Sequence, residues 1–308
     1  MIRRSVWFIF LALGATCARA QDPVIRVDVR LVRMLVTVKD AAGKLIGSLK
    51  KSDFTVQDNG VDQEIAVFER QTEQPLSVAL LVDSSASVGI ELRYELDSVS
   101  KFLKAMLGEG NPEDAVALYT FNWQVSLMRS FTRRYAVLDQ RLRQLKPDGG
   151  TSLYDAIFLA SQDLEGRQGR HVMVVVTDGG DTTSAKNFHQ ALESLQMADA
   201  VIYPVLVMPI TNSAGRNIGG ENALTSFAAG TGGRVFTPSS NAELDRAFTE
   251  ILNELRTQYL IGFYPRNVPP TQDRFHILKV KVPDRNLRVL TRSGYYGDSS
   301  VSPKGPVR

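Results

Sequence analysis

The alternation of apolar and polar residues changes along the chain, and it divides the sequence into three zones. In the first zone, residues 24–32 alternate almost strictly between apolar and polar side chains. This period of two predicts a half-buried β-strand. Further strands are predicted at 35–39, 54–56 and 65–68, with turns at 40–43 and 58–60 and a polar linker at 71–75. We therefore expect residues 21–75 to form a β segment.

The middle zone contains nearly continuous apolar runs at 76–82, 171–176 and 201–207. Runs of this kind are typical of central strands that are buried on both faces of a parallel sheet. Other strands are predicted as a hairpin at 116–121 and 125–131 and as a short last strand at 232–236, and helices are predicted at 90–107, 133–145, 152–165, 185–198, 221–229 and 241–256. The alternation of strands and helices predicts an α/β fold over 76–256, a doubly wound, mostly parallel sheet of six strands.

The last zone, 257–297, again predicts strands, at 258–264, 275–282 and 287–291. Each flanking β zone is short for an independent domain, because a stable sheet needs several strands with a shared apolar face. We therefore expect 21–75 and 257–297 to pair in one small β-sandwich-like domain, with the α/β domain inserted between them. The polar tail at 298–308 is expected to be disordered.

The first twenty residues have the pattern of an export signal. Arg3 and Arg4 precede a short apolar stretch at 6–15, and Ala18-Arg19-Ala20 is a small-x-small cleavage site. The alternative is a buried helix or a membrane anchor, although the apolar stretch is short for a bilayer span. We expect cleavage after Ala20, which places the protein in the periplasm or outside the cell with no membrane span.

This signal changes what the composition means. The chain has 36 basic and 33 acidic residues, and three of the basic ones, Arg3, Arg4 and Arg19, lie in the signal, which leaves 33 of each sign. The single cysteine, Cys17, lies there too, and the residues before it fit a lipoprotein signal poorly, so we expect no lipid anchor. The remaining chain has no cysteine for disulfides, metal binding or nucleophilic catalysis. With no net charge, it also gives no indication of nucleic-acid binding.

Candidate chemistry lies at three loops of the predicted α/β domain. Asp83-Ser84-Ser85-Ala86-Ser87 follows the first apolar strand, Thr151 precedes a helix, and Asp178 follows the strand at 171–176. Ligands bind at the carboxyl ends of the strands in open α/β sheets, so one site can contain all three loops. The residues that indicate a metal site are Asp83, Ser85, Ser87, Thr151 and Asp178. They offer only oxygen ligands, which suit Mg²⁺, Mn²⁺ or Ca²⁺ better than Zn²⁺.

Each of these residues also has a structural interpretation. Asp83 to Ser87 can cap the following helix, Thr151 can cap the helix at 152–165, and Asp178 can be a turn residue beside Gly179 and Gly180. Their joint occurrence, in this order and at alternate strand ends, favours a metal site.

These five positions resemble the metal-ion-dependent adhesion site of the von Willebrand factor type A family, in which D-x-S-x-S is joined by a Thr and a second Asp. The resemblance covers 76–256 and implies the strand order 3-2-1-4-5-6, with the hairpin strand at one edge. It implies direct binding of a divalent cation, most commonly Mg²⁺, by Ser85 and Ser87. Asp83 would bind largely through water, and Thr151 and Asp178 would exchange between direct and water-mediated contact. The flanking segments, DFTVQDNG and QYLIGFYP, resemble the secreted relatives of this family in acidobacteria.

Other residues are weaker candidates. Asp181, Asp148 and Asp155 lie near the site in sequence, but capping or surface roles are expected for them. The three histidines, His171, His189 and His276, are far apart and have no matching acid in sequence. Trp123 and Phe121 are expected to pack in the hairpin, although an exposed Trp123 could contact a partner. The glycine-rich loop at 215–220 is expected near the metal face.

The resemblance implies a protein-binding module whose cation bridges to an Asp or Glu carboxylate of a partner protein. The alternatives are an envelope scaffold in which the metal stabilises a loop, and a metal-dependent hydrolase. No motif of a known hydrolase or nucleotide-binding site is present, so we do not expect an enzyme. The helix at 241–256 could transmit a conformational change to the flanking β domain. The sequence does not determine the partner, the preferred ion or the oligomeric state.

Overall fold

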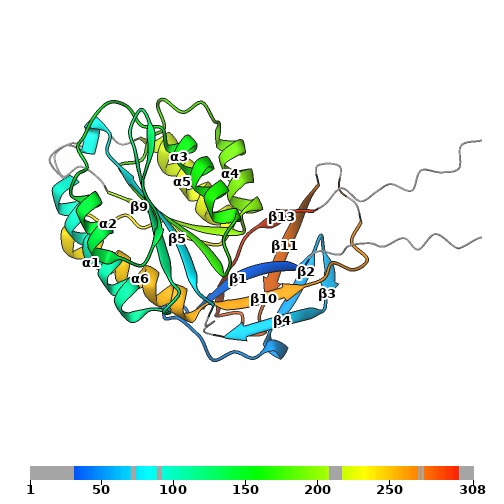
Figure 1. Ribbon diagram of the computed structural model, residues 1–308. Helices are drawn as coiled ribbons and strands as arrows, with labels where there is room; N and C mark the ends of the chain where they lie inside the picture. The colour runs from blue at the N-terminus through cyan, green and yellow to red at the C-terminus, as the bar shows by residue number, and fades with distance from the viewer. Residues whose placement is uncertain are drawn as a thin grey trace, which may run out of the picture.

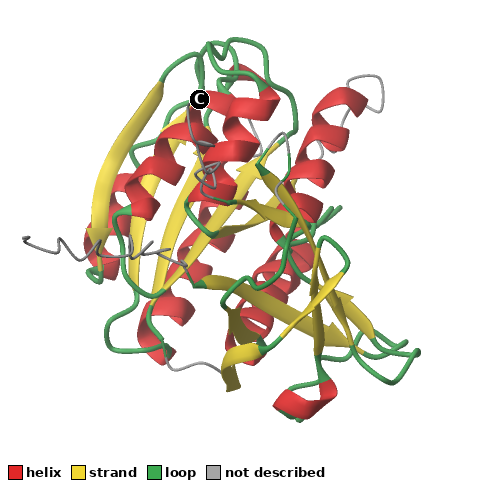
Figure 2. Cartoon of the chain, turned by 90° about the vertical axis from the view of Figure 1, so that its right-hand side faces the viewer, coloured by secondary structure: helices red, strands yellow, loops and turns green. Residues whose placement is uncertain are grey.

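The computed structural model describes residues 31–70, 74–88, 92–207, 217–269, 271 and 274–297. Two bodies are visible in Figure 1: an α/β domain that contains the six α-helices of the described residues, and a pair of antiparallel sheets. Figure 2 shows the same division from the side, with the helices gathered around one sheet and the smaller sheets beside it.

The α/β domain is built on a five-stranded sheet in the order β7-β6-β5-β8-β9. Its strands are β5 (Leu76–Asp83), β6 (Ala115–Phe121), β7 (Val125–Thr132), β8 (Arg170–Thr177) and β9 (Ala200–Leu206). All neighbours are parallel except β7, which pairs antiparallel with β6 at the edge. The doubly wound fold, the order of the first five predicted strands and the edge hairpin are therefore confirmed, whereas the predicted sheet of six strands is not.

Helices cover both faces of this sheet, as Figure 1 shows. They are α1 (Leu92–Glu109), α2 (Tyr135–Leu142), α3 (Leu153–Glu165), α4 (Phe188–Met197), α5 (Ile218–Thr231) and α6 (Asn241–Thr257). Successive residues of β5 face opposite sides, so Val78 and Leu80 join the core under α1, α2 and α6. Ala79 and Leu81 join the core under α3, α4 and α5. This explains the continuous apolar run, because both faces of the strand are covered.

The expected sixth strand is reduced to one bridge. Among the described residues, Phe236 pairs in parallel with Val205 of β9, but no longer ladder forms. Gly232 and Gly233 precede this position, and Pro238 follows two residues later. Because glycine weakens strands and proline cannot donate to a ladder, the segment has too few suitable residues to extend the pairing.

The flanking segments contribute to two four-stranded antiparallel sheets, β12-β1-β10-β4 and β13-β11-β2-β3. Their strands are β1 (Val32–Lys39), β2 (Thr55–Asp58), β3 (Val61–Gln63), β4 (Ile65–Arg70), β10 (Tyr259–Phe263), β11 (Phe275–Lys281), β12 (Arg288–Leu290) and β13 (Gly294–Tyr296). Each sheet contains strands from before and after the α/β domain, and one apolar core lies between them. We call this body the sandwich. The exact domain boundaries stay a prediction.

Two short strands of the sandwich, β3 and β13, were not expected. The turn at Asn59-Gly60, where both residues have positive φ, connects β2 to β3, while β4 pairs with β10 in the other sheet. A type I′ turn needs positive φ at both central positions, which Asn and Gly tolerate best. The turn was therefore expected correctly, but the strand it leads to was missed.

The sandwich contacts the α/β domain at the amino ends of the parallel strands. Leu35 of β1 and Leu260 of β10 belong to the same core as α1 and α6, so this sheet is apolar on both faces. Buried polar contacts accompany them. Glu254 of α6 accepts hydrogen bonds from Lys39 and from Arg234, both at 2.6 Å. We call this contact region the junction.

Several expectations fall outside the described residues. The signal at 1–20, the tail at 298–308, most of the strand at 24–32 and the first part of the glycine-rich loop at 215–220 lie there. Within the described ranges, none of the helices has the combined length and hydrophobicity that a bilayer span requires.

Candidate functional site

The three loops identified from sequence meet at the carboxyl end of the parallel sheet. The backbone N–H of Asp148 donates to the carbonyl of Ser84 at 2.9 Å, and Ala86 N–H donates to the carbonyl of Gly149 at 3.1 Å. Thr182 N–H donates to the carbonyl of Thr151 at 2.8 Å. These bonds join the loop after β5 to the loop before α3, and that loop to the one after β8.

Asp83 lies at the centre of this arrangement and is fully buried. Its Oδ2 accepts a hydrogen bond of 2.6 Å from the Thr177 hydroxyl, and its Oδ1 accepts one of 2.8 Å from Ser85 N–H. The first bond fixes the end of β5 to the end of β8 across the sheet. Sequence reasoning did not single out Thr177, although its position directly before Asp178 at a strand end could have indicated a role.

The environment of Asp83 disfavours its ionised form. Burial, with a smaller contribution from the charge of Asp178, raises the pKa of this carboxyl to about 6 against the opposing effect of the hydrogen bonds from Thr177 and Ser85. No Lys or Arg side chain forms an ion pair with Asp83 in the part of the chain that the structure describes. The carboxylate is therefore buried among neutral hydroxyls and beside a second acid.

The other four predicted ligands differ in how deeply they are buried beside Asp83. The hydroxyls of Ser85 and Ser87 lie 3.0 Å apart, with Ser85 buried and Ser87 exposed. Thr151 is buried, and Asp178 is half-buried and close enough to affect the titration of Asp83. The loops thus bring two carboxylates and three hydroxyls to one end of the sheet, reaching the surface at Ser87 and Asp178.

Glycine positions allow these loops to approach one another. Gly149 has φ +65°, and a Cβ there would lie 2.2 Å from Cδ1 of Trp123. A side chain at Gly220, near the start of α5, would lie 1.3 Å from the carbonyl oxygen of Gly179. Both residues are glycines because the neighbouring loop occupies the space that a side chain would need.

The weaker acidic candidates have structural roles. Asp181 Oδ1 accepts from Tyr154 N–H at 3.1 Å in the first turn of α3, which is the capping role expected for it. The carboxylate of Asp155 accepts from the N–H groups of Ala185 and Lys186. The N-cap residue of α3 is Ser152, so Thr151 does not cap this helix. That removes the structural alternative for Thr151.

The donor set fits a hard divalent cation. Two carboxylates with hydroxyls and water are ligands typical of Mg²⁺, and the buried carboxylate of Asp83 is the group that a cation would neutralise. The described residues contain no group of three or more His, Cys, Asp or Glu placed to hold a metal. A metal here would therefore depend on the hydroxyls of Ser85, Ser87 and Thr151, and the metal site stays a prediction.

One expectation about the histidines was wrong. His276 of β11 does have an acid partner, because its Nδ1 lies 2.9 Å from Oδ1 of the fully buried Asp58 in β2. Oδ2 of Asp58 accepts from the Tyr295 hydroxyl at 2.6 Å. Asp58 and His276 are 218 positions apart in sequence, so only the pairing of β2 with β11 shows that they are in contact. His171 is buried and bonds to backbone carbonyls, as expected for a core histidine.

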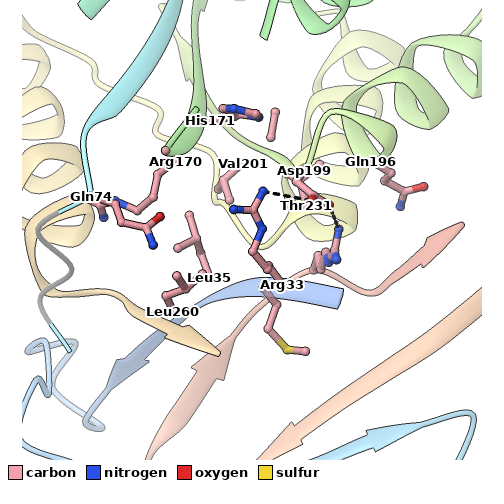
Figure 3. A pocket seen from close by; sticks show the side chains of 14 residues that line it. Arg33, Leu35, Gln74, Arg170, His171, Gln196, Asp199, Val201, Thr231 and Leu260 are labelled. Carbon is pink, nitrogen blue, oxygen red and sulfur yellow. Dashed lines mark hydrogen bonds and ion pairs between the residues drawn. The ribbon is translucent and has the colours of Figure 1, made fainter. Parts of the chain in front are cut away.

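A second concave region lies at the opposite end of the sheet, at the junction (Figure 3). In Figure 3, Arg33 extends from β1 toward Asp199, which precedes β9. Asp199 also accepts from Arg292 at 2.5 Å. Asp199 is therefore paired with two arginines of the sandwich, whereas Asp83 has no basic partner among the described residues.

Comparisons with known proteins agree with this geometry. Residues 78–180 match the sequence profile of the von Willebrand factor type A domain. No curated protein sequence matches the chain.

Similar solved structures include the vWF domain of the type V pili tip protein Mfa5 from Porphyromonas gingivalis, with 15% identity and a TM-score of 0.49, over 58% of this chain and 94% of that one. Another is BatB, a conserved hypothetical protein from Bacteroides thetaiotaomicron, with 17% identity and a TM-score of 0.47, over 59% of this chain and 100% of that one. A third is a von Willebrand factor type A protein from Catenulispora acidiphila, with 10% identity and a TM-score of 0.49, over 86% of this chain and 74% of that one.

The profile match covers most of β5 and all of α1, β6, β7, α2, α3 and β8, and it ends two residues after Asp178. With the observed strand order, it shows that residues 78–180 of this chain are similar to the von Willebrand factor type A domain.

Proposed function

We propose that this chain is an exported, metal-dependent protein-binding module. Asp83, Ser85, Ser87, Thr151 and Asp178 would hold a divalent cation, with Mg²⁺ the expected ion. The bound ion would supply an electrophilic centre that accepts an Asp or Glu carboxylate from a partner protein. The family assignment supports a protein-interaction module as the general class of function.

The observation that carries the proposal is the buried carboxylate of Asp83. A buried charge without a counter-ion is costly, and proteins normally pair or neutralise such groups. Here the neighbours are Thr177, Ser85 and a second acid, and none of them supplies positive charge. A cation at this position would neutralise two acids at once and explain why the carboxylate is retained.

The exposure of the site supports binding rather than a purely stabilising role. Ser87 is exposed and Asp178 is half-buried, so the donor set extends from the buried Asp83 to the surface. A group from another molecule can therefore approach. A metal that served only to stabilise the fold would be better enclosed by its own protein ligands.

Calorimetric titration with Mg²⁺ tests the metal site. The Asp83→Ala variant is expected to lose measurable Mg²⁺ binding while its circular dichroism spectrum stays that of the original chain. Asp148→Ala is the matched control, because Asp148 is an exposed acid three residues before Thr151 that contributes only a backbone bond to this region. Its Mg²⁺ affinity should be unchanged. Equal Mg²⁺ affinity in the original chain and in Asp83→Ala would refute the proposal.

A further inference from the structure

Three large hydrophobic side chains are exposed around the loops that contain the predicted ligands. Trp123, in the β6–β7 hairpin, is 51% exposed, Ile218, at the start of α5, is 65% exposed, and Tyr94, in the first turn of α1, is 56% exposed. We call these three residues the apolar rim. Single exposed apolar residues are common, but several around one site are typical of an interaction surface.

Trp123 is held in place by the metal-site loops themselves. Its indole packs against Gly149, two residues before Thr151, closely enough that a Cβ on Gly149 would collide with the ring. The carbonyl of the preceding residue, Asn122, accepts a 2.6 Å bond from Ser152 N–H. The hairpin and the Thr151 loop therefore form one unit, and the exposed ring loses little conformational freedom on binding.

Ile218 lies on the opposite side, beside the Asp178 loop. The start of α5 contacts that loop directly, because a Cβ on Gly220 would overlap the carbonyl of Gly179 and a Cβ on Gly180 would lie 2.2 Å from Nδ2 of Asn217. Asn217 caps α5 by accepting from Gly220 N–H at 2.9 Å. Ile218 is thus fixed on the first turn of a capped helix that rests on the loop of Asp178.

Tyr94 is the third member of the rim and lies in the helix that follows the Asp83 loop in sequence. The loop after β5 ends in a short 3₁₀ turn at Ala86–Val88, and α1 is described from Leu92. Tyr94 is the third residue of this helix. Each of the three predicted ligand loops is therefore accompanied by one exposed hydrophobic side chain.

We propose that the apolar rim selects partners in which an acidic residue is flanked by apolar or aromatic side chains. This inference rests on the proposed function, in which the partner offers a carboxylate to the cation. Apolar contacts at Trp123 and Ile218 would exclude water around that carboxylate and strengthen its electrostatic interaction. A rigid, exposed tryptophan next to the site is the kind of residue that dominates binding energy in protein interfaces.

A random peptide library displayed on phage, selected on the immobilised full chain in Mg²⁺ and released with EDTA, tests this specificity. The released peptides are expected to share an Asp or Glu with an apolar or aromatic neighbour. One enriched peptide is then synthesised and titrated against variants. Trp123→Ala should weaken its binding about tenfold or more, and Trp123→Phe should restore part of it. Tyr264→Ala, which removes an exposed aromatic residue from the sandwich, is the control and should have no effect.

The outcomes separate this inference from the proposed function. If Mg²⁺ binding depends on Asp83 but Trp123→Ala binds the peptide as tightly as the original chain, only the apolar rim is refuted. The same conclusion follows if the selected peptides carry an acid but no apolar neighbour. If no peptide is released by EDTA, the metal-bridged carboxylate of the proposed function fails together with the rim. If Mg²⁺ binding does not depend on Asp83, the proposed function itself fails.

Discussion

The acidic residues at the two ends of the parallel sheet differ in their partners. At the amino end, in the junction, Glu254 is paired with Lys39 and Arg234, and Asp199 with Arg292. At the carboxyl end, Asp83 is buried with only hydroxyl and amide donors around it and with Asp178 nearby. These two acids of the junction are paired with basic residues of the same chain, and the pairs with Lys39 and Arg292 connect the two bodies. The charge of Asp83 has no such partner among the described residues, and in the proposed function a divalent cation would neutralise it.

The largest expected effect of a substitution lies in the junction. Glu254→Gln would leave the side chains of Lys39 and Arg234 without their shared carboxylate in a buried position. Breaking a fully buried ion pair costs about 3–5 kcal/mol, but Lys39 and Arg234 are partly exposed and Arg234 keeps its ion pair with Glu250, so urea unfolding should show a loss of about 2–3 kcal/mol. Mg²⁺ affinity should be unchanged in conditions where the variant is folded. A loss below about 1 kcal/mol would show that the junction charges contribute little to stability.

Asp83→Asn is expected to increase the free energy of unfolding, whereas Glu254→Gln decreases it. Burial raises the pKa of Asp83 to about 6, so in metal-free conditions the stability of the original chain is full below the unfolded-state pKa and falls as pH rises through 6. Near neutral pH the amide should therefore raise the free energy of unfolding by about 2 kcal/mol in EDTA, since about two pKa units correspond to roughly 3 kcal/mol before the altered hydrogen bonds are considered.

This gain has two checks. It should vanish near pH 4, where Asp83 is protonated, and Mg²⁺ should stabilise the original chain but not Asp83→Asn. Thermal unfolding across pH 4–8, with and without Mg²⁺, measures both. A variant less stable than the original chain in EDTA at pH 7 would show that the carboxylate is satisfied without a metal.

A smaller effect is expected at Gly149→Ala, which tests how closely the loops of the carboxyl end depend on one another. The positive φ and the contact with Trp123 should cost about 1–2 kcal/mol in thermal unfolding and weaken Mg²⁺ binding by displacing the Thr151 loop. Gly166→Ala is the control, since this residue ends α3 at φ −76° with no atom near the added methyl group. If both variants behave alike, the contact between Trp123 and Gly149 does not position the site.

Sequence patterns predicted the α/β domain well because its elements are long and strongly periodic. The run from Leu76 to Val82 and the helical spacing after Leu92 each have one consistent interpretation. The candidate ligands were also found from sequence, since D-x-S-x-S and Asp178 directly follow such strands. Their convergence depends on a sheet order that only the family resemblance supplied.

What the sequence did not reveal depends on distant contacts or on very short elements. The strands at 61–63 and 294–296 have three residues each, too few for a pattern. The pair of Asp58 and His276 forms only when β2 and β11 meet across the sandwich. Phe236 failed to extend a sixth strand because local glycine and proline chemistry outweighed its apolar character.

The connectivity of β5 also has a mechanical consequence. This strand begins at the linker from β4 of the sandwich and ends at Asp83, so a partner pulled away from the site would load it along its own axis. Its hydrogen bonds to β6 and β8 run across that direction on both sides. They would have to slip together rather than open one by one. Tension applied at Asp83 would therefore act on a strand that is hydrogen-bonded along both edges, which favours resistance to force.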